Sequence, residues 1–142
     1  MTALQATGMP TVREIDGAPA PDPVACARLE CSERLAVLRF PAAVSSGGGN
    51  VEARFRGVST LSFGWPNDEA LPGHRLWGSG LKYYAIQEIS NSDLIEELER
   101  RNAAHQRHRP GTYRDCRHII ITFKEDTFEC VCAAMELAHT RR

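Results

Sequence analysis

The stretch from Arg117 to Ala134, RHIIITFKEDTFECVCAA, is the most hydrophobic part of the chain. Three isoleucines and a phenylalanine lead into the polar residues 124–127, and a second apolar run occupies residues 128–134. β-Branched and aromatic residues on both sides of a short polar turn predict a β-hairpin. We therefore expect two antiparallel strands here, at the centre of a sheet.

The length of the turn determines which side chains of this hairpin face the core. A two-residue turn at Glu125 and Asp126 pairs Lys124 with Thr127 and places Thr122 opposite Glu129. One face then carries Ile119, Ile121, Phe123, Phe128, Cys130 and Cys132, and the other carries His118, Ile120, Thr122, Glu129, Val131 and Ala133. We favour this register because small thiols are common in protein cores. A three-residue turn would move both cysteines to the side of His118.

Length and composition indicate one globular domain. The chain has 142 residues, of which 42% are hydrophobic and 25% charged, enough for one core. The net charge of −1 gives no general attraction to nucleic acid or anionic lipid. We expect a cytoplasmic protein, because no signal region is apparent and no segment approaches the roughly 20 apolar residues of a membrane span. The five cysteines are then free thiols.

The first third of the chain predicts an arm followed by paired strands. Residues 1–23 are rich in proline and small residues, so we expect a flexible N-terminal arm, with a single α+β domain at 24–142. Residues 24–40 predict a hairpin whose second strand lies further inside the sheet. The run from Ser45 to Asn50 contains three consecutive glycines and predicts a flexible connector, because it lacks the Lys-Ser/Thr of a phosphate-binding loop.

Residues 51–142 predict two further strands and one helix besides the hairpin. Alternation over 51–63 predicts one long strand with a bend near Gly57, and residues 81–89 predict an aromatic-rich strand. A helix is expected from an N-cap at Asp93 to about Gln106. The pattern leaves 133–142 open, as a short helix or the end of a strand. The fold class is therefore α+β, with a mainly antiparallel sheet of about five or six strands and one main helix packed on one face.

The irregular segment 64–80 is the best candidate for a lid or binding loop, because loops of this length are often functional. If it folds over the polar face of the hairpin, histidines and carboxylates meet in one pocket, where a histidine beside a carboxylate can act as a general base. The catalytic candidates are His118, Glu129, His74 and Glu88. The ligand-binding candidates are Arg75, Trp77, Tyr84 and Thr122.

Histidine and cysteine pairs elsewhere give only a weak metal signal. The pairs are His105 with His108, Cys116 with His118, and Cys130 with Cys132. None has the C-x2-C spacing of a zinc knuckle. We therefore predict neither a metal site nor a cofactor.

A local basic run lies between residues 100 and 118. It contains Arg100, Arg101, Arg107, Arg109, Arg114 and Arg117. Only Tyr113 is available there to stack on a base, and no RNA-binding consensus is present. Basic residues at the end of a helix suit its dipole, so we prefer that explanation and regard nucleic-acid binding as a minor alternative.

No nucleophile motif accompanies these residues, and the leading interpretation is a small non-catalytic binding or regulatory module with a protein or small-molecule partner. The alternative is a small enzyme that uses a His/Glu acid–base pair in a pocket under the 64–80 loop. Open sheet edges would also permit a homodimer, although the sequence does not identify the edge.

Overall fold

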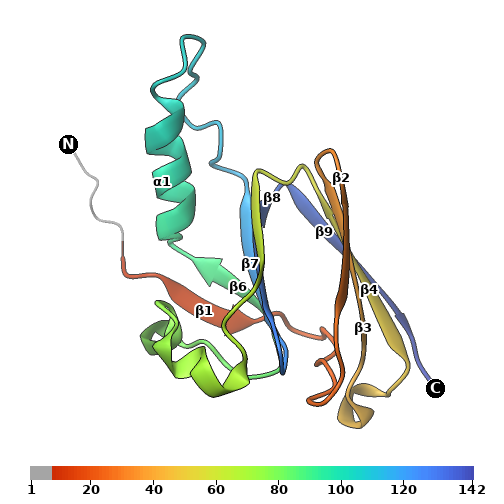
Figure 1. The fold of residues 1–142 in the computed structure, drawn as a ribbon. Helices are drawn as coiled ribbons and strands as arrows, with labels where there is room; N and C mark the ends of the chain where they lie inside the picture. Colours follow the sequence, from red (N-terminus) through yellow and green to blue (C-terminus); the bar gives the residue numbers. More distant parts are fainter. Residues whose placement is uncertain (1–7) are drawn as a thin grey trace.

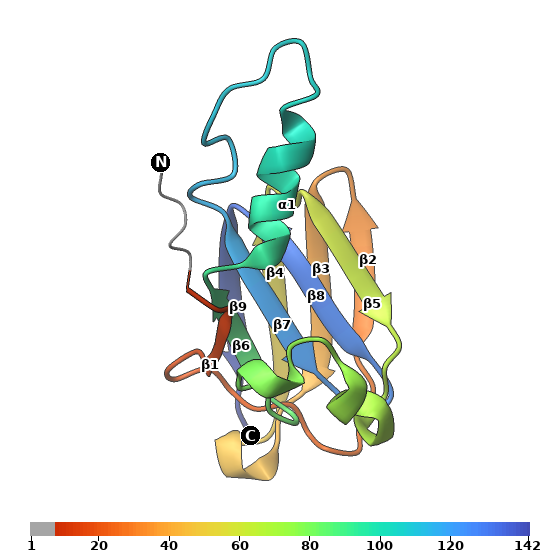
Figure 2. The same cartoon turned by 90° about the vertical axis from the view of Figure 1, so that its left-hand side faces the viewer.

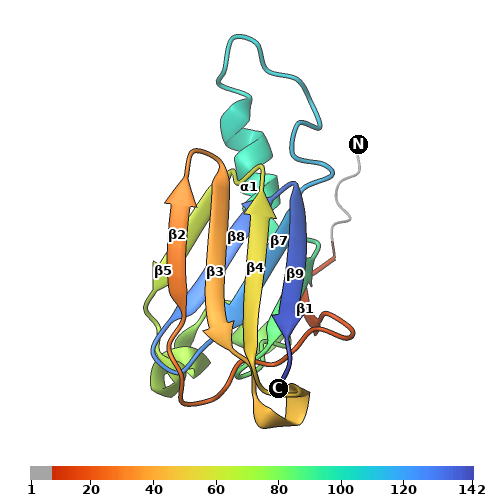
Figure 3. The ribbon, with the colours of Figure 1, turned by 90° about the vertical axis from the view of Figure 1, so that its right-hand side faces the viewer.

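Two antiparallel β-sheets pack face to face, with one α-helix outside them (Figure 1). The computed structural model describes residues 8–142. The first sheet has the order β1 (Thr11–Glu14), β6 (Ile86–Ser90), β7 (Arg117–Thr122), β8 (Thr127–Cys132), β5 (Thr60–Gly64). The second has the order β2 (Arg28–Ser32), β3 (Leu35–Pro41), β4 (Asn50–Arg56), β9 (Ala134–Thr140), seen face-on in Figure 3. The helix α1 spans Asp93–Asn102, and short 3-10 turns occupy Val44–Ser46, Asp68–Gly73 and Trp77–Ser79.

The predicted class is confirmed, since the described residues form antiparallel sheet and one main helix. The predicted number of strands is too low: residues 8–142 contain nine, divided between two sheets. The predicted hairpin at 24–40 is present as β2 and β3, and β3 lies inside its sheet between β2 and β4.

The central hairpin keeps its predicted faces but not its predicted pairs. Thr122 pairs with Thr127, and Glu129 lies opposite Ile120 rather than Thr122. Four residues, not two, therefore connect the strands, and the Phe123 N–H donates to the Asp126 carbonyl at 2.9 Å. The register differs from the expected one by two residues, and because side chains alternate with a period of two, every side chain stays on its predicted face.

The core lies between the two sheets. The hairpin supplies the side chains predicted for it, Ile119, Ile121, Phe123, Phe128, Cys130 and Cys132, and all are buried. They meet the inner side of β3 and β4, where Phe55 stacks on Phe128 with ring centroids 4.8 Å apart. Burial of one such aromatic side chain stabilises a fold by roughly 1.5–3 kcal/mol.

On its outer face the first sheet is covered near one end by α1 and near the other by the segment with the 3-10 turns (Figure 2). The segment that contains the two 3-10 turns at 68–79 packs Leu71, Leu76 and Leu81 against Ile120 at one end. At the other end lies α1, whose apolar residues are half-buried.

The predicted long strand at 51–63 is in fact two strands in different sheets. Gly57 has a φ of +64° and ends β4, after which the chain crosses to the other sheet as β5. A second crossing, from β8 to β9, passes Ala133 at the same place, where the Ala133 N–H donates to the Arg56 carbonyl at 2.8 Å. A Cβ atom on Gly57 would lie 2.8 Å from the Ala133 Cβ, so the corner needs glycine.

Both ends of the chain are more ordered into sheet than the sequence suggests. The prediction of an arm over residues 1–23 is wrong for Thr11–Glu14, which pair with β6, while residues 1–7 lie outside the described part. The open question over 133–142 is settled in favour of a strand, because β9 pairs with β4 along its length.

Local bounds also differ from the predictions near the helix and the glycine run. The strand expected at 81–89 begins only at Ile86, and α1 ends at Asn102 with Ser92, not Asp93, as its N-cap. The glycine run is a tight turn rather than a loose connector: a Cβ on Gly49 would lie 1.8 Å from the Thr140 carbonyl oxygen. Within residues 8–142, no helix is long and apolar enough to cross a membrane.

Candidate functional site

Polar side chains are buried on the outer face of the first sheet, beneath the two covers. They are Gln87, His118, Thr122 and Glu129, together with Thr127 at the end of the hairpin. Alternation along β6, β7 and β8 places the first four on this face, opposite the sandwich core. Since a buried polar group without a hydrogen bond is costly, each of these must find a partner.

Glu129 is the centre of this group, and three basic side chains converge on it. His118 Nε2 lies 2.5 Å from one carboxylate oxygen, and Arg75 Nη1 lies 3.1 Å from the other. The second Arg75 amino group also binds, which makes the contact bidentate. His74 Nε2 lies 3.6 Å away, while its Nδ1 accepts from the Leu76 N–H. The Glu129 side chain is only 7% exposed, so these partners replace its water.

These contacts determine the ionisation of Glu129. Burial acts to raise the pKa of the carboxyl group, but the donors on His118, His74 and Arg75 outweigh it and hold the pKa well below the usual range. Glu129 is therefore ionised at neutral pH. A carboxylate with such a low pKa accepts protons poorly, which makes it a weak general base.

His118 links Glu129 to the start of α1. Its Nδ1 lies 2.7 Å from Ser92 Oγ, and the same oxygen accepts from the Ile95 N–H at 3.0 Å as the helix N-cap. An imidazole with its proton on Nε2 satisfies both neighbours: it donates to Glu129 and accepts from the Ser92 hydroxyl. His118 is 2% exposed, so no substrate reaches it in this structure.

Thr122 and Gln87 hold the covering segment, residues 68–85, against the first sheet. Thr122 Oγ1 donates to the Lys82 carbonyl at 2.8 Å, and the Gln87 side chain accepts from the Lys82 N–H at 2.7 Å. Thr122 also accepts from the Ala85 N–H. The predicted ligand-binding candidate Thr122 is thus enclosed by the chain's own backbone.

Tyr84 and Trp77 do not converge on Glu129. The Tyr84 hydroxyl donates to Asp68 Oδ2 at 2.6 Å, and this hydrogen bond raises the pKa of Tyr84 to about 12. Trp77 packs against the smaller apolar cluster, with its ring 5.4 Å from that of Tyr83. Both residues brace the covering segment.

Glu88 lies on the opposite face from His118, so the grouping expected from the sequence is wrong for this residue. It pairs across the sheet with Ile119, a core-facing residue. Its carboxylate accepts two hydrogen bonds from Arg117, at 2.9 and 2.7 Å, and these lower its pKa. Glu88 is therefore half of an ion pair at the rim of the sandwich.

A cleft of about 520 Å³ opens beside Glu129. It is bounded by the edge strand β5, by the first turns of α1 and by Arg75. Its lining residues are Thr60, Leu61, Ser62, Arg75, Asp93, Leu94, Glu97, Arg100 and Glu129. The Arg75 side chain is 55% exposed and lies over the buried carboxylate. Neither His118 nor Ser92 lines this cleft.

Several of these residues are not apparent from the sequence. The single alternating run at 51–63 conceals Thr60 and Ser62, which lie on an edge strand of the first sheet. The pattern predicts the cap at Asp93, whereas Ser92 is the N-cap. The run Ser92-Asp93-Leu94 carried a usable signal, because serine before an apolar helical stripe is a preferred N-cap.

The other histidine and cysteine pairs lie outside the cleft beside Glu129, and of the basic run only Arg100 lines it. In residues 8–142, no group of three or more His, Cys, Asp or Glu side chains is placed to hold a metal ion. The Cys130 thiol has a raised pKa, from its hydrogen bond with Cys132 and from burial. Of the six arginines in the basic run, three bind carboxylates of the chain itself: Arg100 and Arg101 bind Glu97, and Arg117 binds Glu88.

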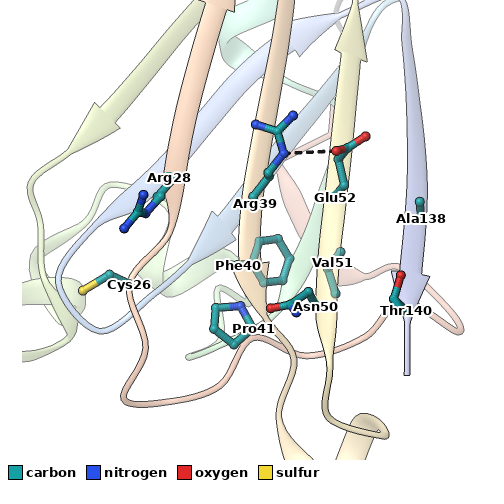
Figure 4. Close-up of a pocket in the computed structure, with 10 residues that line it drawn as sticks. All are labelled: Cys26, Arg28, Arg39, Phe40, Pro41, Asn50, Val51, Glu52, Ala138 and Thr140. Carbon is teal, nitrogen blue, oxygen red and sulfur yellow. Dashed lines mark hydrogen bonds and ion pairs between the residues drawn. The ribbon is translucent and has the colours of Figure 1, made fainter. Parts of the chain in front are cut away.

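A second hollow, of about 480 Å³, lies on the outer face of the second sheet (Figure 4). It extends from Cys26 across β3 and β4 to Ala138 and Thr140 on β9. Among its charged residues, Arg39 donates to Glu52 at 3.1 Å, and Arg28 also lines the hollow.

The first cleft therefore combines a half-exposed guanidinium, two hydroxyl groups and a strand edge above an ionised carboxylate. Comparison with known proteins finds no matching family model, no matching curated protein and no matching solved structure.

Proposed function

We propose that this protein is a non-catalytic binding module whose protein partner docks in the cleft between β5 and α1. The observation that carries the proposal is the half-exposed Arg75, held in place over the cleft by the buried Glu129. An arginine whose planar head is already fixed loses little side-chain freedom when it binds a partner.

The walls of the cleft suit a protein better than a small molecule. The cleft is open and mixes charged, hydroxyl and apolar groups, whereas small-molecule sites usually enclose their ligand. β5 is an edge strand, so its outer backbone N–H and C=O groups are available to an extended segment. Thr60 and Ser62 add hydroxyl groups beside it.

The low proton affinity of Glu129 and the burial of His118 support a binding role over acid–base catalysis. In this proposal the polar network is a support. It fixes Arg75 and the start of α1 on either side of the cleft, so that a partner meets a preorganised surface.

A matched pair of serine substitutions tests the proposal. Ser62→Arg fills the cleft from an exposed position on β5, and Ser32→Arg places the same side chain on the exposed edge strand β2 of the other sheet. In affinity capture from extracts of the source cells, we expect a stoichiometric partner with the unmodified protein and with Ser32→Arg, and its loss with Ser62→Arg. Equal capture by both variants, each shown to be folded by circular dichroism, would refute the cleft as the docking site.

A second candidate function rests on one specific observation, the chain of contacts Ser92–His118–Glu129. A hydroxyl, an imidazole and a carboxylate in series are the parts of an acyl-transfer site. Ser92 also follows Asn91, whose φ of +54° makes a sharp turn between β6 and α1. Against it, Ser92 Oγ already serves as the cap of α1 and does not line the cleft.

A fluorophosphonate probe distinguishes the two functions, because it labels only serines that a base activates. The binding proposal expects no stoichiometric labelling of the folded protein. Labelling that is complete in the unmodified protein and absent in Ser92→Ala would favour the enzyme.

A further inference from the structure

The edge of the second sheet carries a further surface, independent of the cleft. β9 is the outermost strand there, and its seven residues make it the longest of the four edge strands, β1, β2, β5 and β9. Every second residue of an edge strand directs its N–H and C=O groups out of the sheet, which makes a long edge a template for another strand.

The side chains of β9 leave apolar surface next to this edge. Met135 and Leu137 point toward the core but are only partly buried, because no strand lies beyond them. The outward residues Ala134, Ala138 and Thr140 are small and exposed. The only charged residue of the strand, Glu136, already binds Arg56 on the neighbouring strand β4 of its own chain.

We infer that β9 pairs with β9 of a second copy of this chain, in antiparallel orientation about a two-fold axis at Leu137. The two four-stranded sheets then form one continuous sheet. Such a contact is isologous, so it closes with two copies and leaves no free β9 edge for further growth.

Symmetry and charge select the register. For the inner faces of both sheets to stay on the same side, residues of like orientation must lie opposite each other. Placing Glu136 on the axis satisfies this rule but opposes the two Glu136 carboxylates. Placing Leu137 on the axis pairs all seven residues and sets Glu136 opposite Ala138 of the other copy.

The remaining pairs in that register are also compatible. Leu137 meets Leu137 of the other copy, which covers the partly buried apolar surface. Met135 meets His139, and Ala134 meets Thr140, so no like charges are opposed. The outer-face hollow that ends at Ala138 and Thr140 would then continue into its symmetry mate across the new contact (Figure 4).

Two opposite substitutions at Ala138 test the register as well as the dimer. Sedimentation equilibrium from about 1 to about 200 micromolar should show association of the unmodified chain to twice its mass. Ala138→Glu opposes Glu136 of the other copy at two symmetric places and should weaken association about tenfold. Ala138→Lys faces the same carboxylates with opposite charge and should strengthen it.

Controls separate dimerisation from folding. Ala138 pairs with Glu52 of its own chain, so the thermal unfolding of each variant is compared at low concentration. Ser32→Glu and Ser32→Lys on the β2 edge should leave association unchanged. A monomer throughout the concentration range would overturn the inference, and so would a dimer that Ala138→Glu and Ala138→Lys affect in the same direction.

Discussion

At the scale of single residues, Glu129 shows how a charge is kept inside this fold. Burial of a carboxylate is costly unless its lone pairs are satisfied. Arg75 and His118 satisfy them with three hydrogen bonds, and His74 Nε2 lies 3.6 Å from the carboxylate. Removing the charge would leave the buried His118 facing a weaker acceptor, and the half-exposed Arg75 without its ionised partner.

Replacing Glu129 with Gln should lower the free energy of unfolding at pH 7 by about 3 kcal/mol, because a buried charged network loses its common acceptor. Urea denaturation measures the change. The matched control is Glu136→Gln, which breaks an exposed ion pair with Arg56 and should change the free energy of unfolding little. Similar losses in both variants would contradict a structural role for the Glu129 network.

At the scale of elements, Ser92 joins the helix to the sheet. Its hydroxyl caps α1 at Ile95 and contacts His118 on β7, so one side chain fixes both the start and the position of the helix. No residue of α1 is fully buried, so packing of an apolar face contributes less to its position than in most amphipathic helices. The contacts of Ser92 are correspondingly more important. One wall of the cleft depends on it.

We expect Ser92→Ala to destabilise the protein by roughly 1–2 kcal/mol, through the lost cap. The loss should appear first in α1, as faster amide hydrogen exchange at Ile95 and the residues that follow it. Ser62→Ala, the same change at an exposed serine on β5, should leave exchange in α1 unaltered. Unchanged exchange in the Ser92 variant would mean that other contacts hold the helix.

The faces of the elements were predictable from the sequence, but their partners were not. Alternation in β7 and β8 identified the core side and the polar side, and it survived a two-residue error in register. Which sheet a strand joins depends on distant pairing, so a single alternating run at 51–63 concealed a crossing at Gly57. Only the observed backbone shows that turn.

The candidate site was also predictable only in part. His74, Arg75, His118 and Glu129 do meet, because the 64–80 segment folds over the predicted polar face. Glu88 does not, because its strand begins at Ile86, after a break at Tyr84 where φ is +48°. The strand expected over residues 81–89 is therefore interrupted before Glu88.

At the scale of the whole molecule, the free energy of unfolding should depend on pH. The pKa values of Glu129 and Glu88 are both lowered in the folded state. A group with a lowered folded pKa contributes stability above its unfolded pKa, and this contribution is lost as the pH falls through the folded pKa. The protein should therefore lose stability on acidification.

We expect the free energy of unfolding to be nearly constant near neutral pH and to fall as the pH drops below about 5, where unfolded glutamates begin to take up protons. Urea denaturation between about pH 7 and pH 3 measures the slope. Glu129→Gln should flatten the slope more than Glu88→Gln, because Glu129 is more deeply buried. A stability that rises on acidification would contradict the low pKa values.

The corner where Gly57 meets Ala133 also determines how the molecule would respond to mechanical load. β9 begins at this corner and ends near the C-terminus at the far end of the sheet. A force on the C-terminus would therefore separate β9 from β4 one residue pair at a time, until the separation reached Ala133. There the load would pass to the crossing at Gly57 and, through it, to both sheets at once.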